Sequence, residues 1–216
     1  MRSLLSVFTA HFPYLVMGLS IAYLFATMVE ARDTIQMLSI STAYVSFLFF
    51  AAALVVAPVR MMLGQSIGVS NGLRRNFGIW AGVFAIAHVV AGLGVHFDGK
   101  IWLYFVYPPE ANKLIPLRYG MFGLTNYLGL FATIAISVLL VISNNYSMRR
   151  LGPARWKRIQ RLAYPLFAAT VLHGLIYQTI ENRFVGLMAL VVAVTFVVIG
   201  FQIRGMSIRR AVRQER

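Results

Sequence analysis

The chain has 216 residues, of which 59% are hydrophobic and only 12% charged, and its mean hydropathy is +0.74. A soluble domain is normally about a quarter charged, so this composition excludes an ordinary soluble protein and indicates an integral membrane protein. The lack of cysteine excludes disulfides, thiolate metal sites and cysteine-ligated iron–sulfur clusters. The net charge of +14 would suggest a nucleic-acid partner in a soluble protein, but here we attribute it to membrane topology.

Six apolar segments are each close to the ~20 residues that a membrane helix needs. They cover residues 12–29, 35–58, 77–97, 120–143, 160–180 and 184–203. We therefore expect an all-α integral membrane protein, a six-helix transmembrane bundle in which residues 1–216 form one domain and 204–216 a short basic tail. No small-x-small cleavage site follows the first segment, and Glu30, Arg32 and Asp33 come next. This pattern favours a retained first helix over a signal peptide.

The basic residues are distributed unequally between the two sides of this expected bundle. The loops and ends on one side carry fifteen Lys and Arg, and those on the other side carry five. The dense basic stretch that begins at Arg149 is expected to be a loop with a turn at Leu151-Gly152-Pro153. The acidic residues divide the opposite way, with only Glu215 on the basic side. Because cytoplasmic loops are enriched in Lys and Arg, both termini are expected in the cytoplasm. The basic surface then faces anionic lipid headgroups and binds no nucleic acid.

Two connecting loops exceed minimal length. The inner loop 59–76 contains GQSIGVSNG, which lacks both the G-x-x-x-x-G-K-[ST] spacing and a preceding strand, so we interpret it as a connector. The outer loop 98–119 contains IWLYFVYPPE, an aromatic run that ends in prolines and cannot continue as a helix. Tryptophan and tyrosine are enriched at membrane interfaces, so this loop is expected at the outer headgroups, where it could cap the bundle.

The four histidines fall into two groups. His11 and His96 lie at helix edges and are interpreted as ordinary interfacial residues. His88 and His173 lie ~17 and ~20 Å from the cytoplasmic ends of their helices, where polar side chains are costly and often functional. Two imidazoles at matched depth on different helices are what a bis-histidine haem requires. The alternative is a pair of buried histidines hydrogen-bonded to Ser, Thr or backbone.

Small residues surround both midmembrane histidines, including Gly174 beside His173 and the pair Gly78 and Gly82 before His88. They leave room for a flat cofactor, and they equally suit close helix packing. Tyr177 follows His173 by four residues and should share its helix face.

Two stretches resemble the ferric-reductase-like transmembrane family: RRNFGIWAGVFAIAH, ending at His88, and LGPARWKRIQRLAYPLFAATVLH, ending at His173. Within that family the resemblance is to its haem-binding branch, the membrane subunit of the bacterial periplasmic methionine-sulfoxide reductase system. It covers roughly residues 74–181. The resemblance implies that His88 and His173 are axial ligands of a b-type haem, in a multi-pass protein of the bacterial inner membrane.

One departure from the family pattern limits the number of haems. Members with two stacked haems carry a second histidine 13 residues upstream of each ligand, and here those positions hold Arg75 and Gln160. Arginine does not ligate iron, and a glutamine amide is a poor ligand. We therefore expect a single haem, and a mechanism that needs a histidine at 160 is in doubt.

The resemblance implies the electron-transfer subunit of an oxidoreductase system. The sequence ends soon after the last apolar segment and has no G-x-G-x-x-G, so electrons are expected from quinol or a separate cytoplasmic flavin reductase. The acceptor implied is a periplasmic methionine-sulfoxide reductase. Ferric iron, as for a stand-alone ferric reductase, is the competing acceptor. Arg74 and Arg75 could hold an FMN or quinone headgroup, or serve only as topology determinants.

Haem propionates need cationic or hydrogen-bonding partners, and Lys100, Arg118 and Arg183, with His96, are the candidates on the outer side. Two neutral imidazoles leave the iron no open position, which suits electron transfer. A non-redox membrane protein, such as a small transporter or an assembly subunit, remains the rival hypothesis. The apolar segments contain no Asp or Glu, residues common in coupled carriers, which weighs against transport.

Overall fold

The structure, a computed structural model, describes residues 4–64, 71–183 and 185–214. Over these residues the chain forms seven α-helices and no strand, which confirms the predicted all-α class. The helices are α1 (Leu4–Met28), α2 (Thr34–Met62), α3 (Asn71–Gly92), α4 (Met121–Ile142), α5 (Asn145–Gln160), α6 (Ala163–Ile180) and α7 (Val185–Gln214).

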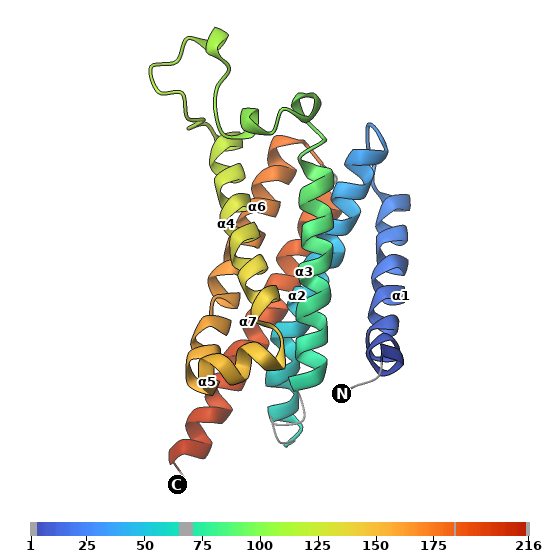
Figure 1. The fold of residues 1–216 in the computed structure, drawn as a ribbon, viewed down its shortest axis with the longest axis vertical. Coiled ribbons are helices and arrows are strands. Elements are labelled where there is room, and N and C mark those ends of the chain that lie inside the picture. The colour runs from blue at the N-terminus through green and yellow to red at the C-terminus, as the bar shows by residue number, and fades with distance from the viewer. Residues whose placement is uncertain (1–3, 65–70, 184, 215–216) are drawn as a thin grey trace.

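Helix α2 is the centre of the bundle. It packs against α1, α3, α6 and α7, while α4 packs against α3 and α6 (Figure 1). Its buried side includes Val45 and Phe49, which lie with Leu166 of α6 among the most completely buried side chains. Helix α1 lies at the edge of the bundle, with most of its apolar side chains exposed. Apolar side chains that face outward in this way suit contact with lipid.

Four described helices are long and apolar enough to cross a membrane: α1 from Thr9, α2, α4, and α7 up to Val212. Helices α3 and α6, which carry His88 and His173, are less apolar than these four. Polar side chains account for this, among them Arg75 in α3 and His173 and Gln178 in α6. Each of the six predicted segments corresponds to one helix, and the prediction that all six span the membrane stays a prediction.

The basic stretch after α4, which the sequence analysis treated as a loop with a turn at 151–153, is helix α5. The loop prediction was wrong because the hydropathy pattern detects apolar helices, and α5 is polar. Asn144 caps it by accepting a hydrogen bond from the Ser147 N–H at 2.7 Å. The expected turn is present within α5, where Gly152 adopts φ 74° and ψ 153° before Pro153.

Other helix boundaries also differ from those predicted from the sequence. Helix α3 ends at Gly92 rather than at residue 97, and α7 continues to Gln214, so the described part of the predicted tail 204–216 is helical. Most of the glycine-rich GQSIGVSNG stretch lies outside the described residues, and so does Glu215.

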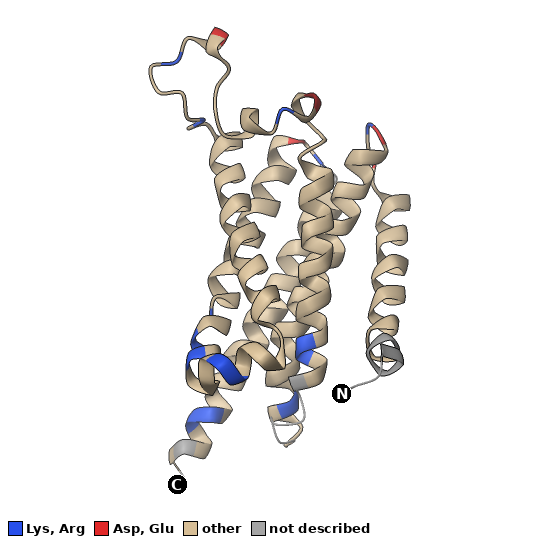
Figure 2. Cartoon of the chain, in the orientation of Figure 1, with Lys and Arg blue, Asp and Glu red and all other residues tan. Residues whose placement is uncertain are grey.

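Charge separates the two ends of the molecule. Basic side chains gather around α5 and the end of α7, whereas the described acidic residues all lie at the opposite end (Figure 2). The first turn of α1 and the last turn of α7 lie at the basic end (Figure 1). This arrangement agrees with the asymmetry expected from the positive-inside rule.

The outer connection between α3 and α4 contains three short 3₁₀ turns, η2 (Phe97–Gly99), η3 (Ile101–Tyr104) and η4 (Pro109–Ala111). Tyr104 is 4% exposed and donates a 2.8 Å hydrogen bond to the Gly92 carbonyl at the end of α3. The Arg118 guanidinium lies 5.0 Å from the ring centroid of Phe97 and donates to the Leu103 carbonyl at 2.6 Å. These contacts fix the connection against the outer end of the bundle.

Candidate functional site

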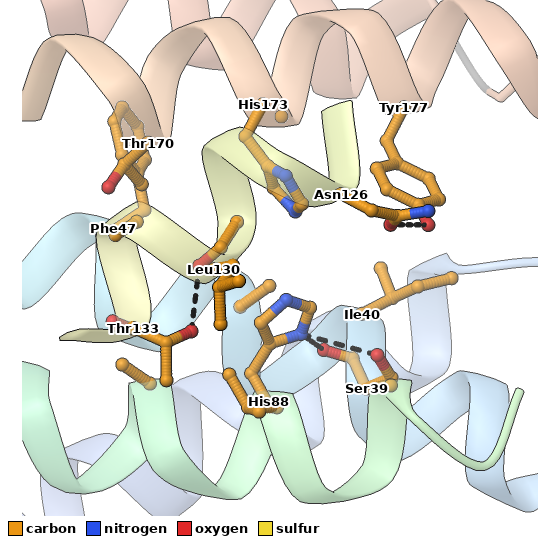
Figure 3. Close-up of a pocket in the computed structure, with 18 of the residues that line it drawn as sticks. Ser39, Ile40, Phe47, His88, Asn126, Leu130, Thr133, Thr170, His173 and Tyr177 are labelled. Atoms are coloured by element: carbon orange, nitrogen blue, oxygen red, sulfur yellow. Dashed lines mark hydrogen bonds between the residues drawn. The ribbon is translucent and has the colours of Figure 1, made fainter. Parts of the chain in front are cut away.

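A cavity of about 460 Å³ lies inside the bundle, with walls from α2, α3, α4 and α6. The side chains that line it are mostly apolar, such as Phe47 and Leu130. His88 enters it from α3 and His173 from α6, and Figure 3 shows the two imidazoles pointing into the same space. Their ring centroids are 6.3 Å apart, and the ring planes are inclined at 77°. The predicted match in depth is confirmed.

Backbone carbonyls determine which nitrogen of each ring is protonated. Nδ1 of His88 lies 2.9 Å from the Ser39 carbonyl of α2, and Nδ1 of His173 lies 2.9 Å from the Thr125 carbonyl of α4. A carbonyl oxygen can only accept a hydrogen bond, so both rings donate through Nδ1–H. Each neutral ring then keeps the Nε2 lone pair for a ligand. Histidines that bind metals are usually held in this way.

The residues present fit a haem. Imidazole nitrogens bind first-row metals at about 2.0–2.1 Å. If two imidazoles bound one metal from opposite sides, their ring centroids would therefore be roughly 6 Å apart. The observed 6.3 Å agrees with this spacing. No group of three or more His, Cys, Asp or Glu side chains gathers in the described residues. A metal held by this pair therefore needs donors from elsewhere, and a porphyrin supplies four nitrogens in a flat, apolar body that suits the cavity walls.

Small residues have divided roles around the cavity. A Cβ added to Gly129 of α4 would lie 2.8 Å from Cε1 of His173, so the ring occupies space that only glycine leaves free. Gly174 lines the cavity with nothing within 4 Å of an added Cβ. Gly82 instead serves helix packing, because its Cβ position lies 3.2 Å from Leu140 of α4.

Tyr177 lies beside His173, as its spacing predicted. The two ring centroids are 5.0 Å apart, and the Tyr177 hydroxyl donates to Oδ1 of Asn126 at 2.7 Å (Figure 3). No sequence motif indicated Asn126, Ser39, Thr125 or Gly129. Thr125 acts on the His173 ring through its backbone carbonyl, whereas Ser39 offers Nδ1 of His88 both its carbonyl at 2.9 Å and its hydroxyl at 3.2 Å. Every residue has a backbone carbonyl, so no sequence signal could have found these two.

The outer candidates for a propionate partner lie in different places. Arg183 and His96 both line the cavity. Lys100 is exposed, and Arg118 packs among the rings of the outer connection, so neither belongs to the cavity wall. Nε2 of His96 lies 3.2 Å from Oε1 of Glu181. The structure thus brings Arg183 and His96 together with the histidine pair and leaves Lys100 and Arg118 apart.

At the inner end, two residues from the stretches that resemble the family contact the end of α4. Arg75 donates from Nε to the Ser143 carbonyl at 2.8 Å, and Trp156 donates from Nε1 to the Ile142 carbonyl at 3.0 Å. Gln160 ends α5, and its buried Nε2 has no hydrogen-bond partner among the described residues. His11 lies away from the cavity and accepts a 3.2 Å hydrogen bond from Trp80.

The fold and site define a class of protein: a multi-pass helical membrane protein with two facing histidines on an internal apolar cavity. Residues 38–171 match the family model described as ferric reductase like transmembrane component, which is more than half of the chain. The chain belongs to this family, which confirms the predicted resemblance. The matched range contains His88 and ends two residues before His173.

The curated proteins that are similar to this chain include the following two. The protein-methionine-sulfoxide reductase heme-binding subunit MsrQ of Rhodospirillum rubrum is 29% identical over 157 residues, which are 69% of this chain and 67% of that protein. The magnetosome protein MamZ of Magnetospirillum gryphiswaldense is 26% identical over 168 residues, which are 78% of this chain but only 24% of that protein.

Proposed function

We propose that this chain is a haem-binding electron-transfer subunit of the bacterial inner membrane, in which His88 and His173 are the axial ligands of one b-type haem. The observation that carries the proposal is the ring pair: the centroids are 6.3 Å apart, and both rings donate through Nδ1–H to a carbonyl. The similarity to a protein named as a heme-binding subunit supports it.

His88 and His173 would hold the haem, which would supply one-electron transfer and leave no position open for oxygen or substrate. The residues of this chain have three tasks around it. The Ser39 and Thr125 carbonyls orient the rings and increase the basicity of Nε2. The mostly apolar walls suit a flat apolar body, and α3 and α6 bring the two ligands to the same cavity.

The side chains in the inner half of the bundle favour one haem over two. Arg75, at one position where a second ligand would be needed, is engaged by the end of α4. Phe167 of α6 comes after Gln160, the last residue of α5, and before His173. Its ring packs on Phe47 and Phe50 at centroid distances of 5.7 and 5.6 Å. These rings fill the bundle on the inner side of the histidine pair.

We infer that electrons enter from the basic, cytoplasmic end and leave at the acidic, outer end. The donor is a quinol or a cytoplasmic flavin reductase. The acceptor is a periplasmic methionine-sulfoxide reductase, a partner that the name of the R. rubrum relative supports. A ferric chelate is the alternative acceptor, supported by the family description.

The test uses the purified full chain in lipid vesicles. Its pyridine haemochrome spectrum should show b-type haem at a ratio of one per chain, and a quinol or a flavin reductase with NADH should reduce it. A periplasmic methionine-sulfoxide reductase with methionine sulfoxide should then reoxidise the haem faster than ferric citrate does. A colourless protein would overturn the proposal, and faster oxidation by ferric citrate would reassign the acceptor.

A further inference from the structure

Arg183 is a cation on the cavity wall. It lies three residues after the end of α6 and is only partly exposed. Its side chain makes no ion pair and no hydrogen bond to any residue in the described part of the chain. Burial lowers the pKa of Arg183, and the nearby Glu181 opposes that shift. A guanidinium stays protonated in proteins, and a partly buried charge without a partner is costly. The cavity therefore favours an anionic occupant near Arg183.

A second unmatched donor lines the same cavity and interacts electrostatically with Arg183. Tyr44 of α2 is 5% exposed and lines the cavity, with its ring stacked on Phe25 at 4.7 Å. Its hydroxyl accepts a 2.8 Å hydrogen bond from Nε2 of Gln178, and Oε1 of that amide has no partner among the described residues. With the amide turned over, Tyr44 would donate to Oε1 and Nε2 would be unmatched. Either orientation leaves one donor without an acceptor.

Neighbouring polar groups on the same wall are already paired. Tyr177 donates to Asn126, and Nε2 of His96 lies 3.2 Å from the Glu181 carboxylate. The unmatched donors near Arg183 are thus its own guanidinium and the Tyr44 hydroxyl, with one unmatched acceptor, Oε1 of Gln178, beside that hydroxyl. The group that satisfies the donors must accept hydrogen bonds and carry negative charge. A carboxylate has both properties. Since most of the cavity wall is apolar, the occupant is an apolar body with a carboxylate at one end.

We propose that Arg183 and Tyr44, the latter positioned by Gln178, form a binding site for a carboxylate of the cavity's occupant. Resting on the proposed function, this carboxylate is a haem propionate. The proposal selects Arg183 from the three basic candidates of the sequence analysis. It also adds two residues, Tyr44 and Gln178, that no sequence pattern indicated.

The test compares haem with haem dimethyl ester, in which both carboxylates are blocked. Each is titrated into haem-free full chain in detergent, and the Kd is read from the absorbance of the bound form. A hydrogen bond to a charged group contributes about 1.5–3 kcal/mol, so the wild type should bind haem about tenfold or more tightly than the ester. Arg183→Gln should weaken haem binding, leave ester binding unchanged and thereby remove the preference. Tyr44→Phe should reduce the preference in part.

Lys100→Gln and Arg118→Gln are the matched controls, since they remove cations of the same face, and both should keep the wild-type preference. The site assignment would be overturned if Arg183→Gln kept the full preference, or if the wild type bound haem and ester equally. If Arg183→Gln does not fold, the site assignment is tested by Tyr44→Phe and by the affinities of the wild type for haem and for the ester. Binding of neither compound by the wild type would instead contradict the proposed function.

Discussion

The position of the His173 ring depends on Gly129, a residue that has no side chain. Gly129 lies on α4, one turn after Thr125, whose carbonyl accepts from His173. The imidazole crosses the α4 backbone at a place where a Cβ would be 2.8 Å from its Cε1. Real Cβ atoms do not approach so closely, so a side chain at 129 must displace the ring.

Replacing Gly129 with Ala should therefore lower the haem content of the purified protein severalfold. The added methyl group moves His173 away from its carbonyl partner and out of register with His88. The measurement is the ratio of haem to protein after purification. Gly78→Ala is the matched control on α3, because nothing lies within 4 Å of its added Cβ. It should keep its haem and gain about 0.5–1 kcal/mol in helix stability. Equal haem content in both variants would contradict this description of Gly129.

The residues of the site differ in how visible they are in the sequence. His88 and His173 stand out because a polar side chain inside an apolar segment has few explanations, and helical spacing gives their depth. Gly129 looks like any other small residue of a membrane helix until the opposite ring is in place. Tyr44 and Gln178 are far apart in sequence and meet only in the folded bundle, so their pairing could not be predicted.

At the scale of elements, the end of α3 is joined to the end of α6 by His96 and Glu181, whose side chains approach to 3.2 Å. Burial lowers the pKa of His96 below its usual 6.5, while Glu181 opposes the shift and the cations Arg32 and Arg183 add to it. A group with a depressed basic pKa is favoured in its neutral form by folding. Its contribution to stability is complete above pH 6.5 and is lost as the pH falls through the folded-state value.

Acidification from pH 7.5 to 5.5 should therefore lower the thermal unfolding midpoint of the wild type more than that of His96→Gln, which cannot take up a proton. The midpoint is measured in detergent by near-ultraviolet circular dichroism. Asp98→Asn changes an exposed neighbour on the same connection and should keep the wild-type pH dependence. An identical pH dependence in the wild type and His96→Gln would show that the imidazole is not the titrating group.

The predicted elements matched the structure where apolar length was the signal and failed where it was not. All six apolar segments became helices, because a stretch of ~20 apolar residues has few other ways to satisfy its backbone in lipid. Helix α5 lies across the inner ends of the bundle (Figure 1) and is rich in Arg, so hydropathy could not reveal it. The hydrogen bonds from Arg75 and Trp156 to the end of α4, which hold this region, come from residues far apart in sequence.

At the scale of the whole molecule, the two ends differ in charge and in structure. The basic end carries the start of α1 and the end of α7, and the outer connection with its aromatic residues covers the other end (Figures 1 and 2). The cavity includes Ile101, Tyr104 and Phe105 of that connection in its wall. A haem in this cavity would lie near the end of the molecule that carries this connection, which agrees with the proposed export of electrons.

Because the chain has no cysteine, single-cysteine variants can test this orientation. Leu114→Cys lies in the fully exposed part of the outer connection, and Tyr146→Cys lies in an exposed position of α5. A membrane-impermeant maleimide applied to intact spheroplasts should label position 114, whereas position 146 should react only after the membrane is permeabilised. The reverse pattern would contradict cytoplasmic termini.

The central claim is that His88 and His173 together hold one haem, and the most direct test is the reduced-minus-oxidised absorbance spectrum of four purified proteins. We expect a b-type difference spectrum from the wild type and its loss in both His88→Ala and His173→Ala. His11→Ala, whose imidazole contacts Trp80 away from the cavity, should keep the wild-type spectrum. Retention of the full haem complement by either cavity variant would contradict the account.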